Sequence, residues 1–276
     1  MNPEISMPYD EISNLPICVR ALYDKFDIKI RPTVDLEKKL KLCSNLTKNN
    51  RVNPKNSLLD VCHAQRVLNA ILACKDENEL REPLKRIAEH SLKTNDTKHS
   101  LGKDALFELE LLQYIKHRKI PASLGEPDIV IKAPFGDYFI ACKTINSLNN
   151  FETQLRSAYH QIEKYGRGCV AFNLEPHMLI EEPLKITNLS VVSQKLKMAV
   201  HAILNKNKRL LKRRISEGRF DGVIFQMTCI IDYQNSLNTF TYTYYFSDAQ
   251  LQKVESFNRF HGLSCSLKGP IVECIY

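Results

Sequence analysis

The chain has 276 residues, of which 43% are hydrophobic and 25% are charged, and its formal net charge at pH 7 is +8. This composition is ordinary for a globular protein and suffices for one large domain or two small ones. No apolar run approaches the roughly 20 residues that cross a bilayer, and the amino-terminal stretch lacks the cationic start and apolar centre of a signal peptide. We therefore expect a cytoplasmic protein and exclude membrane partners.

The nine cysteines predict neither a disulfide framework nor a metal site. Their number is odd, they lie singly in apolar contexts, and no pair has the CxxC spacing of zinc sites and redox motifs. Free cysteine behaves as a small apolar side chain. We therefore expect reduced, buried thiols.

Helical periodicity dominates the first 100 residues. Apolar side chains recur at helical spacing in three segments, 35–44, 57–74 and 77–91. The polar segment 93–103 has no periodicity and is a plausible boundary loop. We expect a helical N-terminal region at 1–100 and a second domain at 101–276.

Strands and helices alternate in the second domain. After a helix at 104–116, the pattern predicts strands at 128–132, 138–145, 169–174, 222–231 and 239–246, and helices at 150–165, about 190–216 and 249–260. This mixture predicts an α/β or α+β fold.

The helix at about 190–216 lies in a segment without acidic residues. From Pro183 to Ser216 there is no Asp or Glu, and apolar residues recur at helical spacing, so one side should be buried and another cationic. A charge run is often only a solvated face, but such faces usually mix signs to gain i,i+4 pairs. A purely cationic face favours a polyanionic partner, nucleic acid above all. The cations predicted to contact it are Lys206, Lys208, Arg209, Lys212, Arg213 and Arg214.

The segment PDIVIKAPFGDYFIACKTI, residues 127–145, has the pattern of a β-hairpin. A two-residue turn at Phe135 and Gly136 would place Asp128 opposite Lys143. Because side chains alternate along a strand, these two residues and Ala141 share one face. The other face is apolar, with Ile129, Ile131, Ile140 and Cys142. The acid and the base form either a simple cross-strand ion pair, worth roughly 0.2–1 kcal/mol, or part of a site.

Two flanking helices add polar side chains beside this hairpin. Glu108 lies in the apolar stripe of the helix at 104–116, and a carboxylate is almost never buried alone, so a cation or a metal is expected near it. Glu110 lies nearer the polar side and is the weaker candidate. In the following helix, Gln161 is a candidate to orient water, metal ligands or phosphate oxygens, and Tyr165 is a candidate nucleic-acid contact.

The order of these features resembles the PD-(D/E)xK nuclease superfamily, which has the restriction-endonuclease-like fold. The features are a helix with Glu, a strand with Pro-Asp, a strand that ends in Ala-Cys-Lys, a helix with Gln-x-x-x-Tyr and a further strand, and they cover about residues 104–174. The Gln-x-x-x-Tyr element is similar to that of the RecB-like branch. The resemblance implies a mixed central sheet flanked by helices, and a nuclease that depends on Mg²⁺ or Mn²⁺.

Residue by residue, the resemblance implies that Asp128 binds the metal, that Glu108 completes or supports its shell, and that Lys143 orients or activates the attacking water. The second carboxylate of the family should stand two residues before the lysine, where this chain has Ala141. Magnesium requires carboxylate oxygens together with phosphate oxygens and waters. We therefore expect the chain as it stands to bind metal poorly and to cleave slowly or not at all.

Three explanations for Ala141 are open. The acid has been substituted so that substrate is held uncleaved, or the missing carboxylate comes from Glu126, Glu152 or Glu163, or activity is lost and a nucleic-acid-binding or scaffolding module is left. The first two predict a nuclease that acts on DNA, with defence against foreign DNA as an analogy to the superfamily. The third predicts a non-catalytic nucleic-acid-binding subunit. A homodimer or a partner protein is compatible with each.

Overall fold

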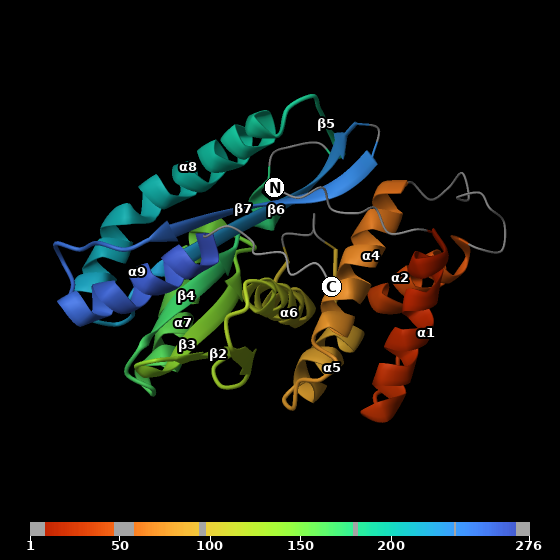
Figure 1. The fold of residues 1–276 in the computed structure, drawn as a ribbon, viewed down its shortest axis with the longest axis horizontal. Coiled ribbons are helices and arrows are strands. Elements are labelled where there is room, and N and C mark those ends of the chain that lie inside the picture. Colours follow the sequence, from red (N-terminus) through yellow and green to blue (C-terminus); the bar gives the residue numbers. More distant parts are fainter. Residues whose placement is uncertain (1–8, 47–57, 94–97, 179–181, 235, 269–276) are drawn as a thin grey trace.

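The structure is a computed structural model that describes residues 9–46, 58–93, 98–178, 182–234 and 236–268. Within these residues a seven-stranded β-sheet lies between two layers of helices, and the helices of the first third of the chain pack beside it (Figure 1). The predicted mixed fold with a helical N-terminal region is confirmed.

The sheet is mixed, and its strands follow the order β1-β2-β3-β4-β6-β5, with β7 paired to β6. The β3–β4, β4–β6 and β5–β6 pairs are parallel, whereas the β1–β2, β2–β3 and β6–β7 pairs are antiparallel. A helix connects β3 to β4, as parallel neighbours require. The strands are β1 (Ala122–Leu124), β2 (Ile129–Ala133), β3 (Gly136–Thr144), β4 (Gly168–Asn173), β5 (Leu184–Ile186), β6 (Val223–Tyr233) and β7 (Ser236–Phe246).

Each face of the sheet is covered by its own pair of helices. Helices α6 (Leu101–His117) and α9 (Val254–Lys268) contribute to the apolar cluster that contains Ile140 of β3. On the other face, α7 (Phe151–Glu163) and α8 (Leu189–Ser216) contribute to a second cluster, which contains the next residue of β3, Ala141. The alternation of side chains along β3 therefore separates two cores.

The N-terminal helices extend the first of these cores. They are α1 (Tyr9–Lys25), α2 (Asp35–Ser44), α4 (Leu58–Ala73) and α5 (Arg81–Glu89), coloured red to orange in Figure 1. Their buried apolar side chains belong to the same cluster as those of α6. The helical region is thus present as predicted, and its core is continuous with that of the sheet. Part of the boundary segment predicted at 93–103, residues 94–97, lies outside the described residues.

The turn of the β2–β3 hairpin is formed by Pro134 and Phe135, one residue earlier than predicted. Ala133 pairs with Gly136, and Gly136 has a φ of +100°. Proline suits the first central position of a turn because its ring fixes φ near −65°, and glycine tolerates the positive φ that follows. The prediction of a Phe135-Gly136 turn was wrong because it gave the proline no part in the turn.

The earlier turn shifts the hairpin register by two residues. Ile129 pairs with Ile140, so the predicted pairing of Asp128 with Lys143 is wrong, and continuing the register places Asp128 opposite Ala141. An even shift leaves every side chain on its predicted face. The apolar face is therefore as predicted, and Asp128 stands closer to Ala141 than the sequence suggested.

Helix α1 and strands β1 and β5 were not predicted. Helix α1 contains Pro16, and strands β1 and β5 have three residues each, so none gives a strong periodic signal. Lys185, which falls in the basic segment, lies in β5 and not in α8. No helix among the described residues is long and apolar enough to cross a membrane.

The eight cysteines in the described part of the chain are free thiols. Five are buried and one is half-buried, in line with the sequence, whereas Cys18 and Cys265 are exposed. Cys274 lies outside the described residues.

Candidate functional site

The centre of the candidate site is the buried carboxylate of Glu108 on α6. Its side chain is 3% exposed, and its two oxygens accept hydrogen bonds from Arg86 of α5, at 2.9 Å from Nη1 and 2.6 Å from Nη2. Burial raises the pKa of Glu108, and the bound guanidinium opposes that change. Glu108 is therefore buried with a cationic partner, as its place in the apolar stripe suggested, and the partner is an arginine of the N-terminal region.

Asp128 lies directly before β2 and reaches across to β3. Its Oδ2 accepts a hydrogen bond from the backbone N of Cys142 at 2.6 Å. Burial raises the pKa of Asp128 well above its ordinary value, and the negative charge of Glu108 raises it further. The positive charge of Lys143 opposes the rise in pKa that burial causes at both carboxyls. Three predicted side chains from separate segments therefore lie close enough to interact.

A third carboxylate, that of Asp104, joins them and was not predicted. It lies one turn before Glu108 on α6, and its Oδ1 accepts a hydrogen bond from the backbone N of Thr144 at 2.9 Å. Its negative charge adds to burial in raising the pKa of Glu108. The i,i+4 spacing of the two acids is the signal that could have revealed it. We define the carboxylate cluster as Asp104, Glu108, Asp128, Arg86 and Lys143.

Ala141 contributes no polar atom to the carboxylate cluster, because the alternation along β3 directs its side chain to the face opposite α6. Its side chain is fully buried in the apolar core beneath α7 and α8. No group of three or more His, Cys, Asp or Glu side chains in the described part of the chain is arranged to hold a metal ion. The residues present do not fit Mg²⁺ or Mn²⁺, which require several oxygen ligands, because both oxygens of Glu108 bind Arg86 and Ala141 supplies none.

The three glutamates considered as replacements for the missing acid differ in their surroundings. Glu152 lies 3.5 Å from Arg214, and Glu163 forms an ion pair with Arg219. Both therefore belong to a charge network on the outer side of α7. Glu126 is exposed and has no ion pair among the described residues, so it alone of the three is not committed to a cation.

Gln161 and Tyr165 lie on and just beyond α7. The ring of Tyr165 stacks on Phe139 of β3, with centroids 4.2 Å apart and planes inclined by 18°. One ring face is therefore used for packing inside the protein, which disfavours the predicted nucleic-acid contact. The Oε1 of Gln161 is buried and accepts no hydrogen bond from a described residue. Such an atom carries a desolvation cost, so Gln161 is still a candidate to bind a ligand.

Helix α8 exposes the predicted cationic face, and half of its predicted contacts are unpaired. Its apolar stripe is buried against β5, β6 and β7, on the outer side of the sheet in Figure 1. Lys206, Lys208 and Arg209 are exposed and form no hydrogen bond or ion pair with any described residue. These three side chains are therefore available to an anionic partner.

The last turn of α8 is already neutralised within the protein. Lys212 lies 2.7 Å from Asp248, and Arg214 lies 2.9 Å from Glu217. Arg213 is 3.8 Å from the same glutamate. These three predicted contacts are therefore less available to nucleic acid than the three cations one turn earlier.

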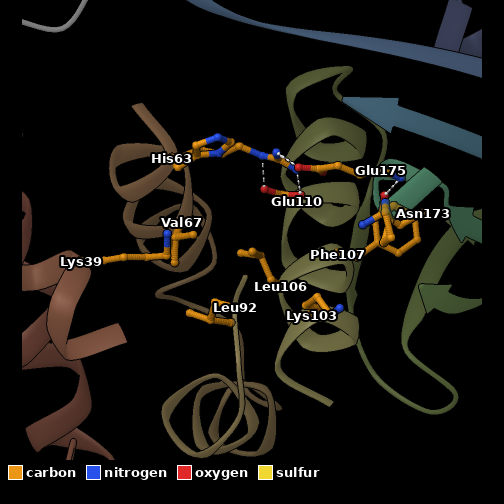
Figure 2. A pocket seen from close by; sticks show the side chains of 12 residues that line it. Lys39, His63, Val67, Leu92, Lys103, Leu106, Phe107, Glu110, Asn173 and Glu175 are labelled. Carbon is orange, nitrogen blue, oxygen red and sulfur yellow. Dashed lines mark hydrogen bonds and ion pairs between the residues drawn. The ribbon is translucent and has the colours of Figure 1, made fainter. Parts of the chain in front are cut away.

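A separate cavity lies at the junction of the N-terminal region and the sheet (Figure 2). It is partly open to solvent, and its described lining contains none of the predicted catalytic residues. The lining comes from α2, α4, α6, the segment after α5, and the end of β4 with the segment that follows it. It consists of Lys39, His63, Arg66, Val67, Leu92, Lys103, Leu106, Phe107, Glu110, Asn173, Glu175 and Pro176.

Arg66 of α4 links the two sides of this junction. It donates hydrogen bonds to both oxygens of Glu110, at 2.6 and 2.8 Å, and to both oxygens of Glu175, at 2.8 and 2.7 Å. Figure 2 shows the two carboxylates converging from α6 and from the segment after β4. Burial opposes the charge of Arg66, but the two carboxylates outweigh burial and raise its pKa well above the ordinary value. Glu110 therefore has a structural partner and lies apart from the carboxylate cluster.

Comparison with the models of known protein families and with curated protein sequences gives no match. The resemblance to the PD-(D/E)xK nucleases therefore stays a prediction from the motifs. A functional proposal must rest on the carboxylate cluster and on the exposed cations of α8.

Proposed function

We propose that this protein binds nucleic acid, DNA in the first place, on a nuclease-type scaffold whose hydrolytic site lacks one carboxylate. The order of helix, two antiparallel strands, crossover helix and parallel strand, from α6 to β4, supports the resemblance to the PD-(D/E)xK nucleases. With an acid in place of Ala141, such a protein would be a nuclease that depends on Mg²⁺ or Mn²⁺. A cytoplasmic setting and a role in defence against foreign DNA are the corresponding analogies.

The observation that carries the proposal is that Glu108, Asp128 and Lys143, from separate segments, lie close enough for their charges to interact. A structural ion pair needs only Glu108 and Arg86, and each further carboxylate beside it adds repulsion. The pKa of Asp128 is raised by burial and by Glu108, so this repulsion acts on a buried group. Buried groups whose pKa values are shifted by burial and by specific charged neighbours occur preferentially at functional sites.

The exposed cations of α8 support nucleic acid as the partner. Lys206, Lys208 and Arg209 lie within one turn of helix and have no described anionic partner. Lysine and arginine that contact phosphates release counterions, so each such cation strengthens binding at low salt. The net charge of +8 favours the same class of partner.

The test is the salt dependence of binding to fluorescently labelled duplex DNA, single-stranded DNA and RNA. For the parent protein, the logarithm of the association constant should fall linearly as the logarithm of salt concentration rises. Replacing Lys206, Lys208 and Arg209 by glutamine should reduce the slope by up to roughly 0.9 for each phosphate that is no longer neutralised. A parent protein without salt-dependent binding would contradict the proposal.

A matched control comes from the same helix. Replacing Lys212, Arg213 and Arg214 by glutamine removes the same number of charges, but these side chains already face Asp248 and Glu217. We therefore expect a smaller change of slope. Equal changes for the two triple variants would show that the internal ion pairs do not decide which cations bind phosphate.

A non-catalytic binding subunit is the second candidate, and the hydrogen bonds from Arg86 to Glu108 favour it. They occupy a carboxylate that a hydrolytic metal would need. Metal-dependent cleavage by an Ala141→Glu variant separates the two candidates, because a scaffold that has lost its chemistry would not regain it from one acid.

A further inference from the structure

We infer that Arg86 occupies the cation position of the carboxylate cluster, so that the helical N-terminal region and a divalent metal ion compete for Glu108. The inference rests on the proposed function, because it concerns the same hydrolytic site. It assigns to α5 a role that the motifs do not contain: Ala141 is only one of two obstacles to metal binding, and Arg86 is the other.

Both carboxylate oxygens of Glu108 accept a hydrogen bond from Arg86. The two guanidinium nitrogens lie 2.9 and 2.6 Å from the two oxygens of Glu108, in the parallel arrangement that a planar guanidinium makes with a carboxylate. A metal ion bound to either oxygen would lie close to the guanidinium, and the two positive charges would repel each other. Arg86 therefore opposes metal binding through Glu108 as long as its side chain stays at this carboxylate.

The charges around Arg86 show why it lies there. Burial lowers the pKa of Arg86, but its hydrogen bonds to Glu108 and the charges of Asp128 and Asp104 outweigh burial and raise it. The negative charges of Glu108, Asp128 and Asp104 thus all attract the Arg86 guanidinium. A divalent ion at the same place would carry twice the charge and would be favoured by the same three groups.

Arg86 also has a route out of the cluster. Its side chain is 27% exposed, whereas that of Glu108 is 3% exposed. Arginine keeps its positive charge when it moves to solvent, and its long stem can reorient without moving the backbone of α5. Withdrawal therefore requires only a movement of this side chain.

The test is titration calorimetry of the 276-residue chain with Mn²⁺ alone, without nucleic acid. Four proteins are compared: the parent, Ala141→Glu, Arg86→Gln and the double variant. The parent should bind no Mn²⁺ measurably, and Ala141→Glu should bind it weakly. The double variant should bind about tenfold more tightly than Ala141→Glu, a difference of about 1.4 kcal/mol.

Arg81→Gln in the Ala141→Glu background is the matched control. Arg81 lies on the same helix, and its ion pair with Glu82 is exposed, so its loss removes one charge without touching the cluster. Mn²⁺ affinity should then equal that of Ala141→Glu. If the glutamine at position 86 prevents folding, Arg86→Lys keeps the charge and loses the two-fold hydrogen bonding, and an intermediate affinity is expected.

Equal Mn²⁺ affinity of Ala141→Glu and the double variant would overturn the inference, as would absence of Mn²⁺ binding to both. A tenfold gain without any cleavage of nucleic acid would uphold the competition and reject the hydrolytic part of the proposed function. Absence of salt-dependent DNA binding by the parent would reject the proposed function and leave the calorimetric result unchanged.

Discussion

Replacing Arg66 by methionine tests whether the N-terminal helices and the sheet form one cooperative unit. The Arg66 side chain is 13% exposed and donates four hydrogen bonds, two to Glu110 and two to Glu175. Methionine keeps most of the aliphatic bulk. It leaves two largely buried carboxylates beside each other without their cation.

The expected loss follows from that stranded pair of acids. Breaking a buried ion pair by removing one partner costs about 3–5 kcal/mol. Because two carboxylates lose the same partner, we expect the upper part of this range, about 4–5 kcal/mol of unfolding free energy. Without the guanidinium, the carboxyls hold protons more tightly in the folded protein than in the unfolded chain, so the loss should be larger at pH 8 than at pH 5.

Urea denaturation followed by circular dichroism measures this loss. The matched control is Arg81→Met, whose ion pair with Glu82 is exposed, and for which we expect a change below about 1 kcal/mol. Adding Glu110→Gln and Glu175→Gln to Arg66→Met should recover part of the stability, because no charge is then left buried. A loss below about 1 kcal/mol for Arg66→Met, or a loss independent of pH, would refute the reasoning.

Two further variants probe groups of the candidate site. Asp128→Asn keeps an oxygen that can accept the hydrogen bond from the N–H of Cys142, and it removes the buried charge. The pKa of Asp128 is raised, chiefly by burial. Ionisation of Asp128 therefore lowers the free energy of unfolding as pH rises above about 4. The variant should therefore be more stable than the parent at pH 7, with a gain that shrinks as pH falls toward 4 in urea denaturation; a gain independent of pH would contradict this. Gln161→Met removes a buried oxygen without a described partner and should be neutral or stabilise by up to roughly 1 kcal/mol in thermal denaturation. A marked loss of stability would show that the amide is bonded.

The elements that the sequence located correctly are those with long periodic patterns. Helix α6, strands β2 and β3 and helix α8 all carry regular apolar spacing, and each begins and ends within three residues of its predicted bounds. Glu108 was recognised because an acid interrupts such a stripe. The register of the hairpin was missed because the alternation of side chains fixes faces but not pairing, which Pro134 and Gly136 decide.

The partners of the buried acids could not be predicted from the sequence. Arg86 lies 22 residues from Glu108, and Arg66 lies 109 residues from Glu175, on helices whose facing sides are set only by packing. A periodic pattern tells which side of a helix is buried, but not which other helix it meets. The i,i+4 spacing indicates that Asp104 and Glu108 share one side of α6, but the hydrogen bond of Asp104 to Thr144 depends on where β3 packs.

The cleavage activity of Ala141→Glu tests the central claim most directly. Ala141 is buried, so a larger side chain costs about 1–3 kcal/mol in packing, and folding must be verified before activity is measured. At high Mg²⁺ or Mn²⁺ concentration, the account predicts cleavage of duplex DNA by Ala141→Glu, none by the equally large but uncharged Ala141→Gln, and loss of the gain when Lys143→Ala is added. A folded Ala141→Glu protein that still binds DNA but cuts neither duplex DNA, single-stranded DNA nor RNA would contradict the account.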